Sequence, residues 1–379
     1  MMGKHRITCM VLLLAMTLLS GCWDSQELEH RTSVVAFGIE RSQTNGQLML
    51  TIQVPIAQKI MGGTGGIKGQ EAIRVMSATG KDLREATAHL QMRLNQELFF
   101  GHARILVISE EMAREGIDKI LDPYRRSPQI RRLMWPMVVK GSSRELLLAN
   151  PKIEQIPTIF IIDLLRNGAR RGLIPDITLG KVFNDYSDQS IEMTMNYVLA
   201  KDKEFKWHGL AVFRDDKLRG RLIDDEVWSL LQLRDDKIAG QMDVSCEQNQ
   251  KGPKKLATFR PKEIQVKKSI TPKGNSYRAQ YHVRLEGDII ESRCQVDFSQ
   301  SKNIERLQKE LNKEGERRAK RLFAKLQNEY HSDVLGLGKL ARATQPNWWN
   351  AKMWKKTFSE GYIQATYDVR IRRTGMEMH

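Results

Sequence analysis

The first half of the chain alternates short apolar runs with amphipathic segments. Runs that are β-branched, apolar or strictly alternating predict strands. These runs lie at residues 33–40, 48–54, 104–108 and 133–139. Apolar residues at helical spacing predict a helix with one buried stripe over residues 81–95. Ser109, followed by two glutamates, predicts the N-cap of a helix that runs toward Asp122, and Ser142 predicts the start of another.

The pattern changes after residue 170. Residues 171–190 are rich in Gly, Asp, Pro and Ser, which predicts a hinge or an inter-domain connection. Residues 208–220 predict a strand, a tight turn at Asp215-Asp216 and a returning strand. Asp224 or Asp225 is expected to cap the short helix that follows. Further strands are predicted over residues 255–267, 277–285, 289–298 and 361–373.

The longest predicted helix lies in the last third of the chain. Its apolar positions recur at steps of three and four: Ile304, Leu307, Leu311, Gly315, Ala319, Leu322, Leu326 and Tyr330. At 1.5 Å per residue this helix is about 40 Å long, enough to cover one face of a sheet. A coiled-coil dimer is the alternative, but Gly315 in the seam and the small number of heptads disfavour it.

These patterns predict an α+β fold, with several mixed sheets, packed helices and one long helix in the C-terminal part. The length of 379 residues suits two or three domains. We expect a leader over residues 1–21, an N-terminal α/β domain over residues 22–195 and a C-terminal α+β region over residues 205–375. That last region can be divided into about 205–255 and 256–375.

The N-terminus has the layout of an export signal. Lys4 and Arg6 precede an apolar run over residues 7–19, and small residues then lead to Cys22. The run holds about 13 residues, whereas a membrane-spanning helix needs roughly 20. Leu19-Ser20-Gly21-Cys22 resembles the lipobox of bacterial lipoproteins, which implies cleavage before Cys22 and acylation of its thiol. An ordinary secretory signal with a chance cysteine is the alternative.

Membrane attachment is expected to depend on Cys22 alone. Beyond the leader, the longest apolar stretch, residues 156–165, is interrupted by Pro157 and Asp163. The net charge of +16 favours contact with anionic surfaces. A protein outside the cell does not meet nucleic acid, so anionic lipid headgroups or acidic proteins are the expected partners. A basic surface that only maintains solubility is the alternative.

The cysteines are too few for a disulfide framework. Cys9 leaves with the leader and Cys22 would be acylated, so only Cys246 and Cys294 could pair. Their spacing matches no metal site. An exported protein permits a disulfide between them, but two buried free thiols are the prediction.

The sequence contains no recognised catalytic or cofactor-binding pattern, since HExxH, GxSxG and a Walker A loop are all missing. Residues 336–341 match GxGxxA but follow a charged helix instead of a strand, so a turn at the helix end is expected. The histidines after the leader are scattered, without an i,i+4 pair to hold a metal. The prediction is a protein that is not an enzyme, with no cofactor and no metal.

Three groups of side chains remain candidates for binding. Two are arginine clusters and the third mixes tryptophan with lysine: Arg125, Arg126, Arg131 and Arg132; Arg166, Arg170 and Arg171; Trp348, Trp349 and Trp354 with Lys352, Lys355 and Lys356. The arginines could bind phosphates or acidic partners, or be solvated surface. The third group suits a headgroup interface or a partner surface. Core packing of at least two of its tryptophans is the commoner outcome.

Several segments, in order, resemble one family. They are Gly21-Cys22-Trp23-Asp24-Ser25-Gln26-Glu27-Leu28, residues 100–109 (FGHARILVIS), residues 209–213 (GLAVF) with Asp216-Lys217-Leu218 and Gly220, residues 333–338 (DVLGLG) and residues 371–375 (IRRTG). This order is similar to that of the Ger(x)C spore germination lipoproteins, the C subunits of nutrient germinant receptors. Leu210 replaces the usual methionine and Leu337 a frequent phenylalanine.

The resemblance implies a three-domain α+β protein on the outer face of a membrane, which in a spore is the inner membrane. It implies action with two integral-membrane partners, an A-type and a B-type subunit, in the response to nutrients. It carries over Cys22 as the acylated residue and implies no enzymatic activity. Two alternatives are a lipoprotein that itself captures a small nutrient in the cleft between its halves, and a cell-wall hydrolase or its activator.

Overall fold

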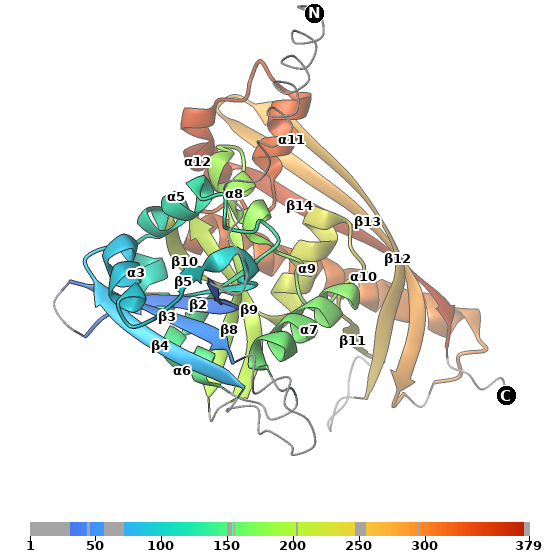
Figure 1. Cartoon of the computed structure of the whole chain (residues 1–379). Coiled ribbons are helices and arrows are strands. Elements are labelled where there is room, and N and C mark those ends of the chain that lie inside the picture. The colour runs from blue at the N-terminus through green and yellow to red at the C-terminus, as the bar shows by residue number, and fades with distance from the viewer. Residues whose placement is uncertain are drawn as a thin grey trace, which may run out of the picture.

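The computed structural model describes residues 31–43, 46–56, 72–149, 154, 156–201, 204–246, 255–294 and 296–374. Within these residues the strands form an eight-stranded, a four-stranded and a two-stranded sheet. The eight-stranded sheet and its helices form one side of the molecule, and the long strands of the four-stranded sheet form the other (Figure 1). The predicted α+β fold, with several sheets and one long C-terminal helix, is confirmed.

The eight-stranded sheet has the order β10-β9-β8-β7-β6-β2-β3-β4. Its strands are β2 (Ala36–Arg41), β3 (Leu48–Pro55), β4 (Ile73–Gly80), β6 (Ile105–Ser109), β7 (Trp135–Lys140), β8 (Thr194–Lys201), β9 (Glu204–Arg214) and β10 (Lys217–Leu222). The central strands β2, β6, β7 and β8 are parallel, and the outer pairs are antiparallel. The two-stranded sheet pairs β1 (Arg31–Ser33) with β5 (Glu97–Phe99), which precedes the short 3-10 helix η3 (Phe100–His102).

Helices cover both faces of the parallel strands, as parallel sheets require. On one face, buried residues such as Ile108 pack with α3 (Leu83–Gln91), α4 (Glu110–Glu115), α5 (Asp118–Arg126) and α8 (Leu179–Ser187). On the other, buried residues such as Val107 pack with α6 (Ser143–Leu148) and α7 (Pro157–Arg170). The predicted caps are confirmed: Ser109 Oγ accepts from Met112 N, and Ser142 Oγ accepts from Arg144 N at 3.1 Å.

The predicted hinge over residues 171–190 is wrong. This segment contains α8, whose N-cap Thr178 accepts a hydrogen bond from Lys181 N. Val182 and Phe183 are buried in the main core. The apolar residues of this short helix outweigh the Gly, Asp and Pro content on which the prediction depended.

The predicted hairpin over residues 208–220 is confirmed as β9 and β10, with Asp215 in the turn at a φ of 57°. The predicted cap of the next helix, α9 (Asp224–Asp235), is wrong. Ile223 is the N-cap, and its N–H donates to the Glu226 carboxylate at 3.0 Å. Asp224 and Asp225 lie in the first turn, where a negative charge is favourable to the helix dipole.

The four-stranded sheet has the order β11 (Met242–Ser245), β12 (Leu256–Lys273), β13 (Ser276–Ser292) and β14 (Tyr362–Arg373). The two strands predicted over residues 277–285 and 289–298 are therefore one strand that ends at residue 292. Register shifts opposite Gly287 let the strands bend without a break. The predicted break was wrong because a bulge does not end a strand.

The long helix is α10 (Ser301–Ala324), which continues as the π-helical turn η4 (Lys325–Tyr330). It packs on the four-stranded sheet, where Gly315 lies close to the ring of Tyr367. Its apolar stripe, including the fully buried Leu311 and Leu322, therefore belongs to the core of the chain itself. Because these apolar residues are already buried against the chain's own sheet, they are not available to form a coiled-coil dimer. Two further helices, α11 (Leu337–Thr344) and α12 (Ala351–Glu360), precede β14. Among the described residues no helix is both long and apolar enough to span a bilayer.

Candidate functional site

Cys22, the predicted site of lipidation, lies outside the described residues, as does the motif at residues 21–28. The other segments that resemble the Ger(x)C family lie within them, apart from Gly375. Two of these segments, residues 209–213 and 333–338, lie close together where the eight-stranded sheet meets the C-terminal helices. Ser332, just before the second segment, donates from Oγ to Phe213 O at 2.5 Å. Asp333 O accepts from the N–H of Glu192, a residue just before β8, at 2.9 Å.

Asp333 is the centre of this junction and is only 3% exposed. One carboxylate oxygen accepts from Gly336 N at 2.9 Å and Leu337 N at 3.1 Å. The other accepts from Gly338 N at 2.7 Å and Trp354 Nε1 at 2.9 Å. Burial raises the pKa of Asp333 to about 6, because the loss of water outweighs these four donors.

This arrangement explains the GxGxxA segment. Gly336, at a φ of 77°, is the N-cap of α11, and Asp333 occupies the N-terminus of that helix. The GxGxxA segment was expected to be only a turn at the end of a helix, but it forms the start of α11. The free N–H groups at the start of this helix bind the Asp333 carboxylate. Asp333 belongs to a motif noted in the sequence, but this role was missed there. An aspartate three residues before a glycine at a helix start is the signal that could have revealed it.

A second buried acid lies beside Asp333. Burial raises the pKa of Glu192, and the nearby Lys355 partly offsets this. Lys355 Nζ lies 3.3 Å from Glu192 Oε1 and also pairs with Asp215 in the β9–β10 turn. The junction therefore holds two buried acids, a lysine and an indole N–H, all paired with one another or with backbone. These contacts join the eight-stranded sheet to the C-terminal helices.

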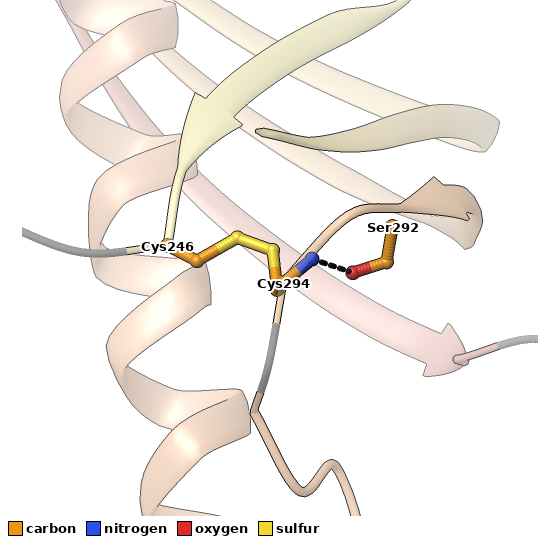
Figure 2. Close-up of a disulfide and its surroundings, with 3 residues drawn as sticks. All are labelled: Cys246, Ser292 and Cys294. Atoms are coloured by element: carbon orange, nitrogen blue, oxygen red, sulfur yellow. Dashed lines mark hydrogen bonds between the residues drawn. A yellow bond between two sulfur atoms is a disulfide. The ribbon is translucent and has the colours of Figure 1, made fainter. Parts of the chain in front are cut away.

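Cys246 and Cys294 form a disulfide, so the prediction of two free thiols is wrong (Figure 2). Their Cα atoms are 5.9 Å apart, and 48 positions separate them in sequence. Backbone pairing brings them together, since Cys246 N donates to Lys255 O and Arg293 N donates to Leu256 O. The disulfide thus links the end of β11 to the chain just after β13, and sequence spacing alone did not show this strand register.

The three candidate binding groups have different outcomes. Arg125 and Arg126 both pair with Asp122, at 3.2 and 2.9 Å, and Arg166 pairs with Asp163 at 3.2 Å. These arginines are part of local, exposed ion pairs. The tryptophans pack as expected: Trp354 is buried, and Trp348 and Trp349 are half-buried against the main core.

Two of the grooves on the described surface have volumes suited to a small molecule. One, of about 470 Å³, lies beside the N-terminal ends of β2 and β6, where Ile159 and Ile162 form an apolar wall near His102, Arg104 and Arg166. The other, of about 580 Å³, is more polar and lies between the end of α7 and β12. It is lined by Arg170, Gly172, Asp236, Lys237, Ile238, Lys262, Glu263 and Gln265. In the described part of the chain, no group of three or more His, Cys, Asp or Glu side chains is arranged to hold a metal ion.

Comparison with known families decides the assignment. Residues 24–199 match the family "Spore germination protein N-terminal domain", and residues 208–375 match "Spore germination B3/ GerAC like, C-terminal". The chain belongs to the Ger(x)C family of spore germination proteins. The boundary between the two matches falls in the hairpin between β8 and β9, inside the eight-stranded sheet.

Individual relatives agree with this family. Spore germination protein YndF of Bacillus subtilis (strain 168) is 27% identical over 98% of each chain, and spore germination protein KC of the same strain is 26% identical over 99% of this chain and 97% of its own. Spore germination protein GerQC of Bacillus cereus is 22% identical over 81% of this chain and 84% of its own. The crystal structure of the GerBC protein matches with a TM-score of 0.59 and 22% identity, over 92% of this chain and 100% of that one.

Proposed function

We propose that this chain is a non-enzymatic, lipid-anchored subunit of a spore nutrient germinant receptor. It is held by Cys22 on the outer face of the inner spore membrane and acts with integral-membrane A- and B-type subunits to trigger germination. The observation that carries the proposal is the match of both germination-protein segments along nearly the whole chain. The N-terminal region from residue 22 and the region from residue 205 form its two functional parts.

Two features of the chain support an extracytoplasmic position. The basic, apolar and small residues before Cys22 have the layout of an export signal. The Cys246–Cys294 disulfide suits an oxidising compartment, because cytosolic reductants keep such thiols reduced. A lipid anchor of two or more acyl chains then provides stable attachment without a membrane-spanning helix.

Mass analysis of the native N-terminus tests the anchor. We expect the protein purified from spores to begin at Cys22 with added acyl mass. Cys22→Ala should abolish acyl labelling, release the protein from the membrane and slow germination with nutrient. Cys9→Ala, which changes a cysteine in the leader, is the matched control and should leave acylation unchanged. A native polypeptide that begins at Met1 without acyl mass contradicts the proposal.

Co-purification tests the receptor assembly. Detergent extracts of spore membranes should yield this chain together with two integral-membrane polypeptides of the A and B types. The Cys22→Ala variant, if exported and folded, should lose most of this association because it is no longer concentrated at the membrane. Recovery of the native chain without any integral-membrane protein contradicts a receptor role.

The second candidate function is direct capture of a small nutrient, and the apolar groove near His102 and Arg104 favours it. Its volume of about 470 Å³ lies in the range of small-molecule sites, and Arg104 is exposed at its edge. Such a groove suits a small carboxylate with an apolar side chain. Isothermal titration with candidate nutrients should show saturable heats that Arg104→Ala removes. Absence of heat for every nutrient that triggers germination excludes this role.

A further inference from the structure

The turn between β12 and β13 brings three segments together at one end of the four-stranded sheet. Trp348 Nε1, in the loop before α12, donates to Gly274 O at 2.9 Å. Ser276 Oγ donates to Glu360 O at the end of α12 at 2.8 Å. The Arg278 guanidinium lies 5.5 Å from the centre of the Tyr362 ring at the start of β14. We call this surface the turn end of the sheet, and it lies beside α11 and α12 in Figure 1.

The charged side chains exposed at the turn end are mostly basic, and large apolar side chains are exposed beside them. Its exposed bases are Lys273, Arg278, Lys352 and Lys356. Met353 is 53% exposed and Tyr362 is 55% exposed, which is high for such large side chains. Glu360 is the acid within reach of this group, and its carboxylate lies 3.8 Å from Lys356 Nζ.

Charge is unevenly distributed along the uncovered face of the sheet. Alternate residues of β12, β13 and β14 point away from the helices, as their alternating exposure shows. Near the turn, the outward-facing positions of all three strands lack a carboxylate. They lie between Lys267 and Lys273 on β12, between Arg278 and His282 on β13 and between Tyr362 and Thr366 on β14. Farther along, Arg284 pairs with Asp368 at 3.0 Å, and Arg372 pairs with Glu263 at 2.7 Å.

The far end of this face is thus neutralised by its own ion pairs, whereas the positive charge at the turn end is left for an external partner. We propose that the turn end of the sheet lies against a bilayer surface that contains anionic phospholipids. Lysines and arginines attract such headgroups, and exposed aromatic or apolar side chains suit the headgroup level. The inference deepens the proposed function, on which it rests, by naming the surface that faces the membrane.

The experiment compares two triple variants of the full-length, acylated chain. Lys273→Gln, Arg278→Gln and Lys352→Gln together neutralise the turn end. Lys302→Gln, Arg306→Gln and Lys309→Gln neutralise three exposed bases on the first turns of α10 and form the matched control. These lie at the opposite end of the sheet, because Gln308 Oε1 accepts from Ile371 N near the end of β14. Equal thermal midpoints show that all three proteins fold.

Each protein is floated with phosphatidylcholine vesicles, with and without phosphatidylglycerol, at low and high salt. The acyl anchor acts on both vesicle types, so the increase in partitioning caused by phosphatidylglycerol measures the protein surface. Each base adds roughly fivefold to this increase, so the turn-end variant should lose roughly 100-fold, and high salt should remove the difference. The control should behave as the wild type.

An increase that is equal in the wild type and the turn-end variant overturns the inference, as does an equal loss in the control. A wild type that does not distinguish the two vesicle types also overturns it and favours an acidic protein as the partner. The proposed anchor is tested separately by flotation with pure phosphatidylcholine vesicles. A chain without acyl groups fails that assay, while the increment from phosphatidylglycerol still reports on the turn end.

Discussion

Replacing Asp333 with asparagine is the sharpest test of the junction between the eight-stranded sheet and the C-terminal helices. Asparagine keeps one acceptor oxygen but turns the other into an NH₂ group. That group would face two N–H donors, either those of Gly338 and Trp354 or those of Gly336 and Leu337. Each buried donor left without an acceptor costs about 1–3 kcal/mol, and removal of the buried charge offsets part of this. We expect Asp333→Asn to lower the free energy of unfolding at neutral pH by about 2 kcal/mol.

The pH dependence separates the charge from the hydrogen bonds. The pKa of Asp333 is about 6 in the folded state and is raised from its ordinary 3.8, so folding favours the protonated form. Its contribution to stability is therefore fully present below pH 3.8 and is lost as the pH rises to about 6. The full loss is about 3 kcal/mol, of which roughly half is recovered on acidification to about pH 5.

The asparagine side chain cannot titrate, so the stability gap between wild type and Asp333→Asn should widen by about 1 kcal/mol between about pH 7 and about pH 5. Urea unfolding followed by tryptophan fluorescence measures this gap, and Trp354 lies next to the change. Asp176→Asn, at an exposed position, is the control and should show a constant gap. A constant gap for Asp333→Asn as well would refute the reasoning. Trp354→Phe removes one donor and should raise the pKa of Asp333 further.

Three further substitutions test the C-terminal sheet. Cys294→Ser should lower the free energy of unfolding by up to about 4 kcal/mol. In thermal denaturation, a reductant should lower the midpoint of the wild type to that of the variant. Gly315→Ala should cost about 1–2 kcal/mol in urea unfolding, because its Cβ would lie 2.6 Å from the Tyr367 ring, whereas the neighbouring exposed Glu316→Ala should be neutral. Asn312→Ala removes the acceptor for Val369 N at the β14 edge and should cost about 1 kcal/mol, with faster amide exchange at that position.

Features that depend on a few neighbouring residues were predictable from the sequence. Ser109 and Ser142 cap helices because their side chains reach N–H groups two or three residues ahead. The apolar stripe of α10 follows from the helical repeat and needs no knowledge of its partner. The β9–β10 hairpin is equally local, since its turn at Asp215 joins strands adjacent in sequence.

Features that depend on distant residues were not predictable. The Cys246–Cys294 disulfide joins residues 48 positions apart, and it follows from the strand pairing that places Lys255 beside Cys246 and Leu256 beside Arg293. The role of Asp333 needs Trp354 from α12, 21 positions away, and a buried position beside Glu192. Even α8 was missed because its buried face is short and its composition favours a turn. In each case the structure depends on a contact with another part of the fold, and the local sequence pattern does not show which part that is.

The boundary between the two family segments has a structural consequence. It falls between β8 and β9, which are neighbours in the eight-stranded sheet, so strands of the second segment complete the sheet of the first. Leu210, Val212 and Phe213 of β9 are fully buried, and a chain that ends at residue 199 would expose both this core and the edge of β8. Phe213 O also accepts from Ser332 Oγ, next to Asp333, so β9 contacts both β8 and the C-terminal part of the chain. The two segments therefore share the eight-stranded sheet and one continuous hydrophobic core.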